Sequence, residues 1–245
     1  MRDLEISGVP CRRYGEDEAQ QVMFLHGGGF VVGGLESHDD VAAEIAARTG
    51  TSVTAVDYRL APEHAHPAAF DDALTVAEAM APPLILVGDS AGGTLAASVA
   101  WALRDSGRIA GQVLIYPALG GLALDLASYR ECARAPLLTT ADIRAYQDLR
   151  GQGSKPDPRL HVLAAPDLKG VAPAFISAAG VDPLRDDGAA YAERLAAEGI
   201  AAHYVVEDQL PHMWLRARHR SARAKAAFDR VIDAVAKMAA GLSAG

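Results

Sequence analysis

The stretch Gly88-Asp-Ser-Ala-Gly-Gly93 follows the apolar run Pro83-Leu-Ile-Leu-Val87 and precedes the helix-like segment Thr94 to Arg104. This order predicts a strand, a sharp turn and a helix, with Ser90 at the turn. A serine hydroxyl is a poor nucleophile at neutral pH, so an enzyme must hold it beside a base and near donors for the developing oxyanion. The flanking glycines lack a Cβ and let two backbone segments pass close together. The stretch therefore predicts a nucleophile elbow that presents the Ser90 hydroxyl above a sheet.

Apolar, strand-like segments alternate with helical segments along most of the chain. This alternation predicts an α/β fold, with a mostly parallel central sheet covered by helices on both faces. The expected strands are Val22 to Leu25, Ser52 to Val56, Leu84 to Val87, Gln112 to Ile115, Ala174 to Ala178 and Ala202 to Val206. Besides Thr94 to Arg104, the expected helices are Val41 to Arg48, Phe70 to Met80 and Asp187 to Glu198.

Two further segments depart from the simple alternation. Leu4 to Tyr14 is expected to add an antiparallel hairpin at the edge of the sheet. The connection between the strands ending at Ile115 and starting near Ala174 is far longer than an ordinary crossover. We expect a single domain over residues 1–245, with a partial cap inserted at about 118–170. The cap should contain a helix from Thr139 to Leu149 and a loop from Gly151 to Pro158.

Composition limits the classes of function. The 245 residues carry a formal net charge of −8, which disfavours a nucleic-acid surface because phosphate binding relies on clustered cations. The basic cluster from Arg216 to Lys225 is expected to be a solvated face of the last helix. No apolar run approaches the roughly 18 residues that a membrane span needs, and the N-terminus lacks a signal-peptide core, so we expect a cytoplasmic protein without membrane contact. Cys11 and Cys132 have no metal-ligand spacing and suggest free thiols in a reducing compartment.

His26-Gly-Gly-Gly-Phe30 follows the strand Val22 to Leu25, where an oxyanion hole should lie. The backbone N–H groups of Gly28 and Gly29, with that of Ala91, are the candidate donors. A flexible glycine loop is the alternative, whereas the dinucleotide fingerprint is incomplete here. His26 is interpreted as a structural histidine that orders the loop.

The acid and the base of a triad should follow the serine in the order Ser, Asp, His. Asp182 fits the acid because it comes just after the strand Ala174 to Ala178, at the edge where open α/β sheets assemble their sites. The alternative is that Asp182 only caps the next helix, a role for which Asp186 and Asp187 are rivals.

His212 fits the base because it follows the strand Ala202 to Val206 by a short polar loop and precedes the last helix. His219 is the nearest competitor, but it should lie in the Arg-rich helix and point to solvent. Ser90, His212 and Asp182 would then form a relay in which His212 takes the serine proton and later returns it to the leaving group.

These motifs resemble the hormone-sensitive-lipase family of α/β-hydrolases, in its bacterial esterase branch. The resemblance runs from about Val22 to the C-terminus. The motifs that carry it, besides the elbow and the glycine loop, are Asp57-Tyr-Arg-Leu-Ala-Pro-Glu63, Ser128-Tyr-Arg-Glu131, Pro136-Leu-Leu-Thr139 and Asp182-Pro-Leu-Arg-Asp-Asp-Gly188. It implies an α/β-hydrolase fold and hydrolysis of short- to medium-chain carboxylic esters, without metal or cofactor. It also implies that Tyr58, Arg59 and Glu63 are scaffold residues.

The sequence departs from the family pattern in two places. Only a short segment precedes the first shared strand, so we expect an incomplete cap, a more open site and weak discrimination for long acyl chains. At the base, the family's usual His-Gly-Phe is His212-Met-Trp214 here, and the bulkier side chains should reshape the pocket or pack in the core. Phe30, Met213 and Trp214 are therefore the candidate pocket residues.

The leading hypothesis is a serine carboxylesterase that acts on a small-molecule ester through an acyl-enzyme. An arylformamidase-like amide hydrolase or a lactone hydrolase is an alternative because the same triad serves those reactions. A non-catalytic ligand receptor is less favoured, since such relatives tend to lose the base, and a dehydratase is the least favoured. A thin cap could leave apolar surface for a second subunit, so a homodimer is also possible.

Overall fold

The computed structural model describes the chain except residues 18, 122–124, 152–155 and 244–245. In the described residues, eight strands form one sheet in the order β1-β2-β4-β3-β5-β6-β7-β8. The strands are β1 (Arg2–Ile6), β2 (Val9–Tyr14), β3 (Gln21–Leu25), β4 (Ser52–Val56), β5 (Leu84–Asp89), β6 (Ile109–Ile115), β7 (Ala174–Val181) and β8 (Ala202–Pro211). The helices are α1 (Leu35–Thr49), α2 (Ala68–Ala79), α3 (Ala91–Ala102), α4 (Ser128–Glu131), α5 (Thr140–Arg150), η2 (Val162–Ala164), α6 (Arg185–Ala197), η3 (Trp214–Ala217) and α7 (Ala222–Ser243).

The sheet confirms the expected α/β architecture. The strands from β3 to β8 are parallel, and β1 and β2 form the predicted antiparallel hairpin beside β4. Beyond Val206 the prediction of a polar loop is wrong, because β8 continues to Pro211 and pairs there with Val181 of β7. A strand pairs through its backbone, so exposed polar side chains do not prevent it. Glu207 is buried in this extension and accepts a hydrogen bond from Ser177 Oγ at 2.9 Å.

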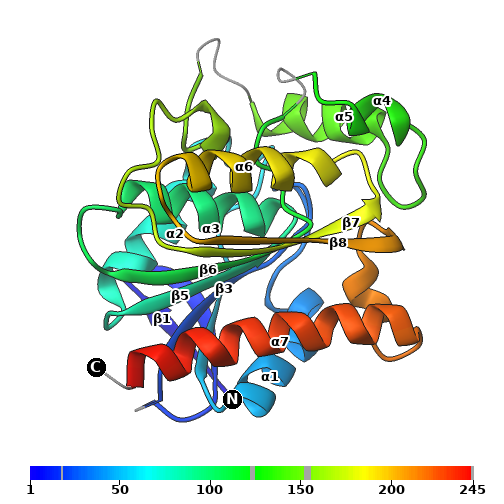
Figure 1. The fold of residues 1–245 in the computed structure, drawn as a ribbon. Coiled ribbons are helices and arrows are strands. Elements are labelled where there is room, and N and C mark those ends of the chain that lie inside the picture. Colours follow the sequence, from blue (N-terminus) through cyan, green and yellow to red (C-terminus); the bar gives the residue numbers. More distant parts are fainter. Residues whose placement is uncertain (18, 122–124, 152–155, 244–245) are drawn as a thin grey trace.

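Helices cover both faces of the sheet (Figure 1): α1 and α7 lie on one side, and α2, α3 and α6 on the other. Two apolar clusters fill the space between the layers. One contains Val41 and Ile45 of α1 with Phe228 of α7, and the other contains Leu95 of α3 and Leu195 of α6. Burying each such side chain stabilises the fold by roughly 1.5–3 kcal/mol. The two clusters hold the central strands, and with them the elbow, in a fixed position.

The long connection between β6 and β7 carries α4, α5 and η2, and α4 and α5 lie over one end of the sheet (Figure 1). The helix α5 begins one residue later than predicted, because Thr139 caps it. Asp142 N–H donates to Thr139 Oγ1 at 3.1 Å, and Thr139 N–H donates to the Asp142 carboxylate at 2.9 Å. Cys132 follows α4 directly. Part of the expected loop after Gly151, residues 152–155, lies outside the described residues.

A buried carboxylate fastens this connection to α6. Asp187 Oδ2 accepts hydrogen bonds from the backbone N–H groups of Leu119 and Gly120 at 2.7 and 2.9 Å, and Asp187 Oδ1 accepts one from Tyr129 Oη at 2.9 Å. Burial raises the pKa of Asp187 to about 7 against the opposing effect of these donors. The Tyr129 ring also packs in a small apolar cluster with Leu184 at the start of α6. The connection is therefore held to the sheet layer by both polar and apolar contacts.

The prediction that the basic cluster from Arg216 to Lys225 forms one solvated helix face is wrong. The residues before Ala222 form η3 and a turn, and Arg218 is buried. Its guanidinium donates to Asp40 at 2.6 Å and to Glu44 at 2.9 Å, both on α1. A cation can be buried when carboxylates compensate its charge. Arg218 therefore joins the C-terminal region to α1.

No helix in the described part of the chain is long and apolar enough to span a membrane.

Candidate active site

Ser90 lies at the turn between β5 and α3, as the sequence predicted, with φ 53° and ψ −117°. A residue other than glycine rarely adopts a positive φ, so the surrounding structure must hold this conformation. Ser90 N–H donates to Ile115 O of β6 at 2.9 Å. Behind the turn, a Cβ on Gly92 would lie 1.9 Å from Leu25 O. Glycine is therefore required there, and it lets α3 start directly against β3.

The structure brings Asp182 and His212 to Ser90 from the ends of the two neighbouring strands β7 and β8. His212 Nε2 lies 2.9 Å from Ser90 Oγ, and His212 Nδ1 lies 2.6 Å from Asp182 Oδ2. Asp182 and His212 are both buried. Because a carboxylate only accepts hydrogen bonds, Nδ1 carries the proton and leaves Nε2 to accept from the serine hydroxyl.

The competing interpretation of Asp182 as a helix cap is wrong, because Leu184 is the N-cap residue of α6 and no side chain caps this helix. The second oxygen of Asp182, Oδ1, accepts a hydrogen bond from Leu184 N–H at 2.9 Å, next to the start of α6. The carboxylate is thus fixed on one side by the backbone and aims its other oxygen at the imidazole. His219, the rival base, lies in a turn rather than in the predicted helix, and its Nε2 is 3.0 Å from Glu44 on α1. It is not part of this site.

Asp89 orders the glycine loop from inside the elbow, a role that the sequence reasoning did not assign. Its Oδ1 accepts a hydrogen bond from Gly27 N–H at 2.7 Å and lies 3.2 Å from His38 Nε2, while Tyr116 Oη donates to its Oδ2 at 3.3 Å. Burial alone would raise the pKa of Asp89, but His38 and the Gly27 N–H group outweigh it and lower the pKa. The position of Asp89 next to Ser90 in the elbow motif could have indicated this role from the sequence.

The next two glycines of the loop have left-handed backbone, with φ 133° at Gly28 and 62° at Gly29. Within the described residues, the N–H groups of Gly28, Gly29 and Ala91 have no hydrogen-bond partner. They are free to donate to a bound group. His26 lies behind the loop and stacks on Tyr58 at a ring distance of 4.2 Å, and burial lowers the pKa of His26 to about 4. This packing agrees with its interpretation as a structural histidine.

A cavity of about 240 Å³ opens at Ser90. Its lining contains most of the predicted site residues: Gly28, Gly29, Phe30, Ser90, Ala91, His212 and Met213. Trp214 was expected to line it too, but this prediction is wrong: Trp214 is 1% exposed and packs edge-on against Tyr116 in the core. Trp214 instead has the alternative role that the sequence left open, packing in the core, and it follows directly after Met213, whose φ is 61°.

Many other lining residues of the cavity come from the long connection between β6 and β7. Tyr129, Leu138, Ile143 and Tyr146 contribute the apolar part of this lining, together with Leu184 just before α6. Arg150 and His161 add a polar part. The sequence did not identify these lining residues. The local sequence of an amphipathic helix does not determine which of its turns will face a serine that is distant in the chain. In the described ranges, no group of three or more His, Cys, Asp or Glu side chains is arranged to hold a metal ion.

Comparisons with known proteins agree with this geometry. The sequence profile of the alpha/beta hydrolase fold matches residues 22–216. The chain is 36% identical to the carboxylesterase NlhH of Mycobacterium tuberculosis, over 94% of this chain and 80% of that protein. It is also 36% identical to the ethyl acetate hydrolase of Pseudomonas putida, over 80% and 66% respectively. Among solved structures, the hyperthermophilic esterase of the archaeon Pyrobaculum calidifontis superposes with a TM-score of 0.88 at 33% identity, over 97% of this chain and 85% of that one.

The family of this chain follows from three findings: the profile match over most of the chain, the identity to curated esterases and the shared fold. The chain therefore belongs to the hormone-sensitive-lipase family of α/β-hydrolases, and it is a carboxylic ester hydrolase.

Proposed function

We propose that this protein hydrolyses short- to medium-chain carboxylic esters through an acyl-enzyme formed on Ser90. The observation that supports this most is the continuous set of contacts from Ser90 Oγ to His212 Nε2 and from His212 Nδ1 to Asp182 Oδ2, at 2.9 and 2.6 Å. Both distances are within hydrogen-bond reach, as a nucleophile, a base and an orienting acid require. The proposed roles are nucleophile for Ser90, base for His212 and orienting acid for Asp182.

In the first half-reaction, Ser90 Oγ attacks the ester carbonyl carbon while its proton passes to His212 Nε2. The tetrahedral intermediate collapses, the bond to the alcohol oxygen breaks, and that oxygen takes the proton from Nε2. In the second half-reaction, water attacks the acyl-serine and gives its proton to Nε2. The bond to Ser90 Oγ then breaks, the proton returns to the serine, and the carboxylic acid leaves. Asp182 stays ionised and stabilises the imidazolium in both halves.

The N–H groups of Gly28, Gly29 and Ala91 are the proposed oxyanion hole. They line the cavity next to Ser90, and they have no partner among the described residues. Unpaired donors held in place before the reaction stabilise the oxyanion without reorganisation, and each such donor is worth about 10²- to 10³-fold in turnover. Asp89 would act as a positioning residue, because it holds the preceding Gly27 N–H group.

Two observations favour small esters. The cavity volume of about 240 Å³ is small for a binding site, and one relative of similar identity is an ethyl acetate hydrolase. We therefore expect acetyl and butyryl p-nitrophenyl esters to be hydrolysed with higher kcat/KM than decanoyl or longer esters. A clear preference for the long chains would contradict this part of the proposal.

The test of the mechanism is Ser90→Ala with p-nitrophenyl butyrate. We expect kcat to fall by at least about 10⁴-fold, because no other group supplies the nucleophile. Ser98→Ala on the same helix α3 is the matched control, since the Ser98 hydroxyl is buried without a partner in the described part of the chain and its loss should leave activity intact. Substantial activity in the Ser90 variant would remove this serine from the mechanism. Faster hydrolysis of N-formylkynurenine than of any ester would favour the amide hydrolase instead.

A further inference from the structure

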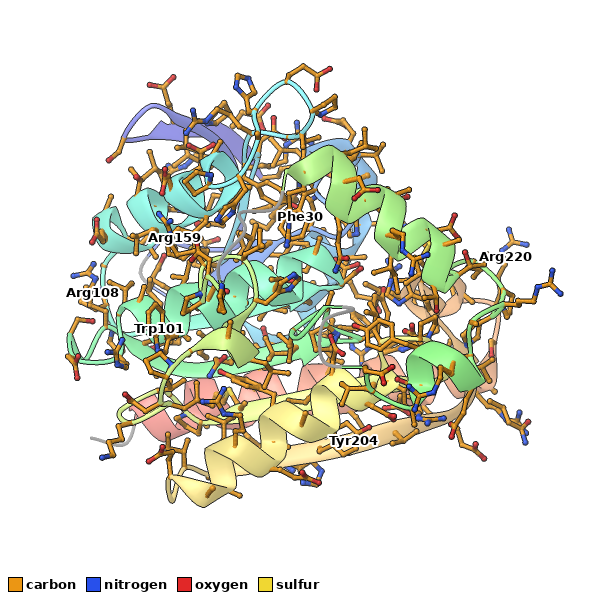
Figure 2. The ribbon with its side chains drawn as sticks, turned by 90° about the horizontal axis from the view of Figure 1, so that it is seen from above. Phe30, Trp101, Arg108, Arg159, Tyr204 and Arg220 are labelled. Atoms are coloured by element: carbon orange, nitrogen blue, oxygen red, sulfur yellow. The ribbon has the colours of Figure 1, made fainter. Side chains whose placement is uncertain are left out.

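The cavity at Ser90 contains a buried cation that the proposed reaction does not use. Arg150, the last residue of α5, lines this cavity and is 5% exposed. Its guanidinium carbon lies 4.1 Å from the centre of the Phe30 ring, and its backbone oxygen accepts a hydrogen bond from His66 N–H at 2.9 Å. The Phe30 ring is itself buried, and Figure 2 labels this residue within the outline of the molecule seen from above. Arg150 is therefore held in place at the inner side of the cap.

Within the described residues, no carboxylate neutralises the Arg150 guanidinium. In residues 1–17, 19–121, 125–151 and 156–243, no Asp or Glu forms an ion pair with it, and its Nε is buried without a hydrogen-bond partner. The guanidinium donates from Nη2 to Leu160 O at 3.2 Å. The carboxylate of Asp157 contributes only at a distance, because it binds His66 at 3.1 Å and Arg159 at 2.8 Å.

A second donor beside Arg150 also lacks a partner. Arg150 Nη2 lies 3.3 Å from His161 Nε2, and because a guanidinium cannot accept, this nitrogen of His161 must accept. The neutral imidazole then carries its proton on Nδ1, which is buried without a partner in the described residues. Burial, together with the charge of Arg150, lowers the pKa of His161 to about 3, so the imidazole stays neutral near pH 7.

Gly121 packs closely against two polar side chains beside Arg150. A Cβ on Gly121 would lie 2.8 Å from His161 Nε2 and 2.9 Å from Gln147 Nε2, so only glycine lets the backbone come this close to both groups. Gln147 and His161 line the same cavity as Ser90. Burial lowers the pKa of Arg150 to about 9, which leaves it charged at neutral pH. A buried, charged and underbonded guanidinium is costly unless an anion compensates it.

From this arrangement we infer that Arg150, with His161 and Gln147, binds a carboxylate of the substrate at the far side of the cavity from the ester bond. The inference rests on the proposed function and narrows its substrate class. The apolar walls at Leu138, Ile143 and Leu184 suit a short methylene spacer. The substrates are then esters that carry a carboxylate at the end of such a spacer, on either the acyl or the alcohol side. Arg150 acts as a specificity residue and takes no part in proton transfer.

The experiment compares each anionic ester with a neutral ester of similar length at pH 7.5 in a pH-stat. Ethyl hydrogen adipate is paired with ethyl hexanoate for the acyl side, and 6-acetoxyhexanoate with hexyl acetate for the alcohol side. We expect wild-type kcat/KM to favour the anionic ester of at least one pair by about tenfold or more, the size of a charge-assisted hydrogen bond. Arg150→Gln should remove most of this preference and alter hydrolysis of the neutral esters much less.

Arg144→Gln is the matched control, because Arg144 is an exposed cation on the same helix and its removal makes the same change in net charge. It should keep the wild-type preference. No preference for either anionic ester in the wild type, or a preference that Arg150→Gln retains, would overturn the inference. Loss of the preference in both variants would also overturn it, since a general charge effect would then explain the selectivity.

Calorimetric titration with adipamic acid keeps the inference testable if Arg150→Gln does not fold. This acid has no ester bond, and the neutral hexanamide is its control. We expect wild-type protein to bind adipamic acid at least about tenfold more tightly than hexanamide, and equal binding would overturn the inference. Failure of the proposed function gives a different result, because all four esters would then remain uncleaved whether or not adipamic acid binds.

Discussion

The two carboxylate oxygens of Asp182 have different partners. One carboxylate oxygen accepts the Leu184 N–H group at 2.9 Å, and the other accepts His212 Nδ1–H at 2.6 Å. A carboxylate has enough lone pairs for both bonds. The bond to the backbone prevents rotation of the carboxylate and so fixes the direction from which the imidazole is held. This bond in the turn before α6 therefore supports the proposed orienting role of Asp182.

Stability should depend on pH through His161. Burial lowers the pKa of His161 from 6.5 to about 3. Between these two pH values His161 is protonated in the unfolded chain but stays neutral in the folded protein. The stability that this neutral histidine contributes is therefore complete above pH 6.5 and is lost as the pH falls toward 3. Between pH 7 and 5 the free energy of unfolding of the wild type should drop by roughly 1–2 kcal/mol more than that of His161→Gln.

Urea denaturation of both proteins at pH 7 and 5 measures this difference. His219→Gln is the control, because His219 is largely exposed and its removal should leave the pH dependence of the wild type unchanged. Parallel curves for the wild type and His161→Gln would contradict the prediction.

At the level of elements, the sequence predicted the parts of the site that local patterns encode. The elbow at Ser90 and the glycine loop are short motifs at strand ends, and Asp182 and His212 follow strands in the expected order. Trp214 packs in the core rather than lining the pocket, and no pattern in the sequence reveals the positive φ of Met213 before it. The sequence placed the insertion between β6 and β7 at the site, but it did not identify which of its residues, such as Arg150, line the cavity, because these contacts join residues that are distant in the chain. Such contacts are set by tertiary packing, which local sequence patterns do not encode.

The anchoring of the cap connection to α6 can be tested at Asp187. Asp187→Ala would remove the acceptor of three buried donors. These donors are the N–H groups of Leu119 and Gly120 and the Tyr129 hydroxyl. We expect the free energy of unfolding to fall by roughly 2–4 kcal/mol. KM for p-nitrophenyl butyrate should also rise, because Tyr129 lines the cavity.

Tyr129→Phe is the graded comparison for this experiment. It removes one of the three bonds and keeps the ring, so it should cost about 1 kcal/mol. Thermal and urea denaturation of the two variants measure these effects. Equal stability of Asp187→Ala and the wild type would show that water or rearranged groups replace the carboxylate.

In the whole molecule, Arg218 connects the C-terminal region to α1. It is buried, pairs with Asp40 and Glu44, and its guanidinium carbon lies 5.4 Å from the centre of the Phe228 ring on α7. Arg218→Ala should lower the free energy of unfolding by roughly 1–3 kcal/mol, because it removes a buried side chain with its bonds to Asp40 and Glu44, while Glu44 keeps Arg48 and His219 as partners.

Arg220→Ala is the control for Arg218. Arg220 lies two residues further along the same turn, and Figure 2 shows its side chain extending away from the molecule. Its loss should change stability by less than about 0.5 kcal/mol. Similar effects of the two substitutions in urea denaturation would contradict the assigned role of Arg218. The sequence left a homodimer and a monomer equally open, and light scattering of the purified protein would decide between them.

The two cysteines differ in a way that has a practical use. Cys11 is 1% exposed in β2, and burial raises its pKa to about 12, so its thiolate is scarce and inaccessible. Cys132 is only partly buried and sits at the end of α4, on the cap. A maleimide dye added to the native protein should therefore attach at Cys132 alone. The wild-type chain thus offers one natural position for a fluorescent reporter, from which cap movement during turnover could be followed without engineering a new thiol.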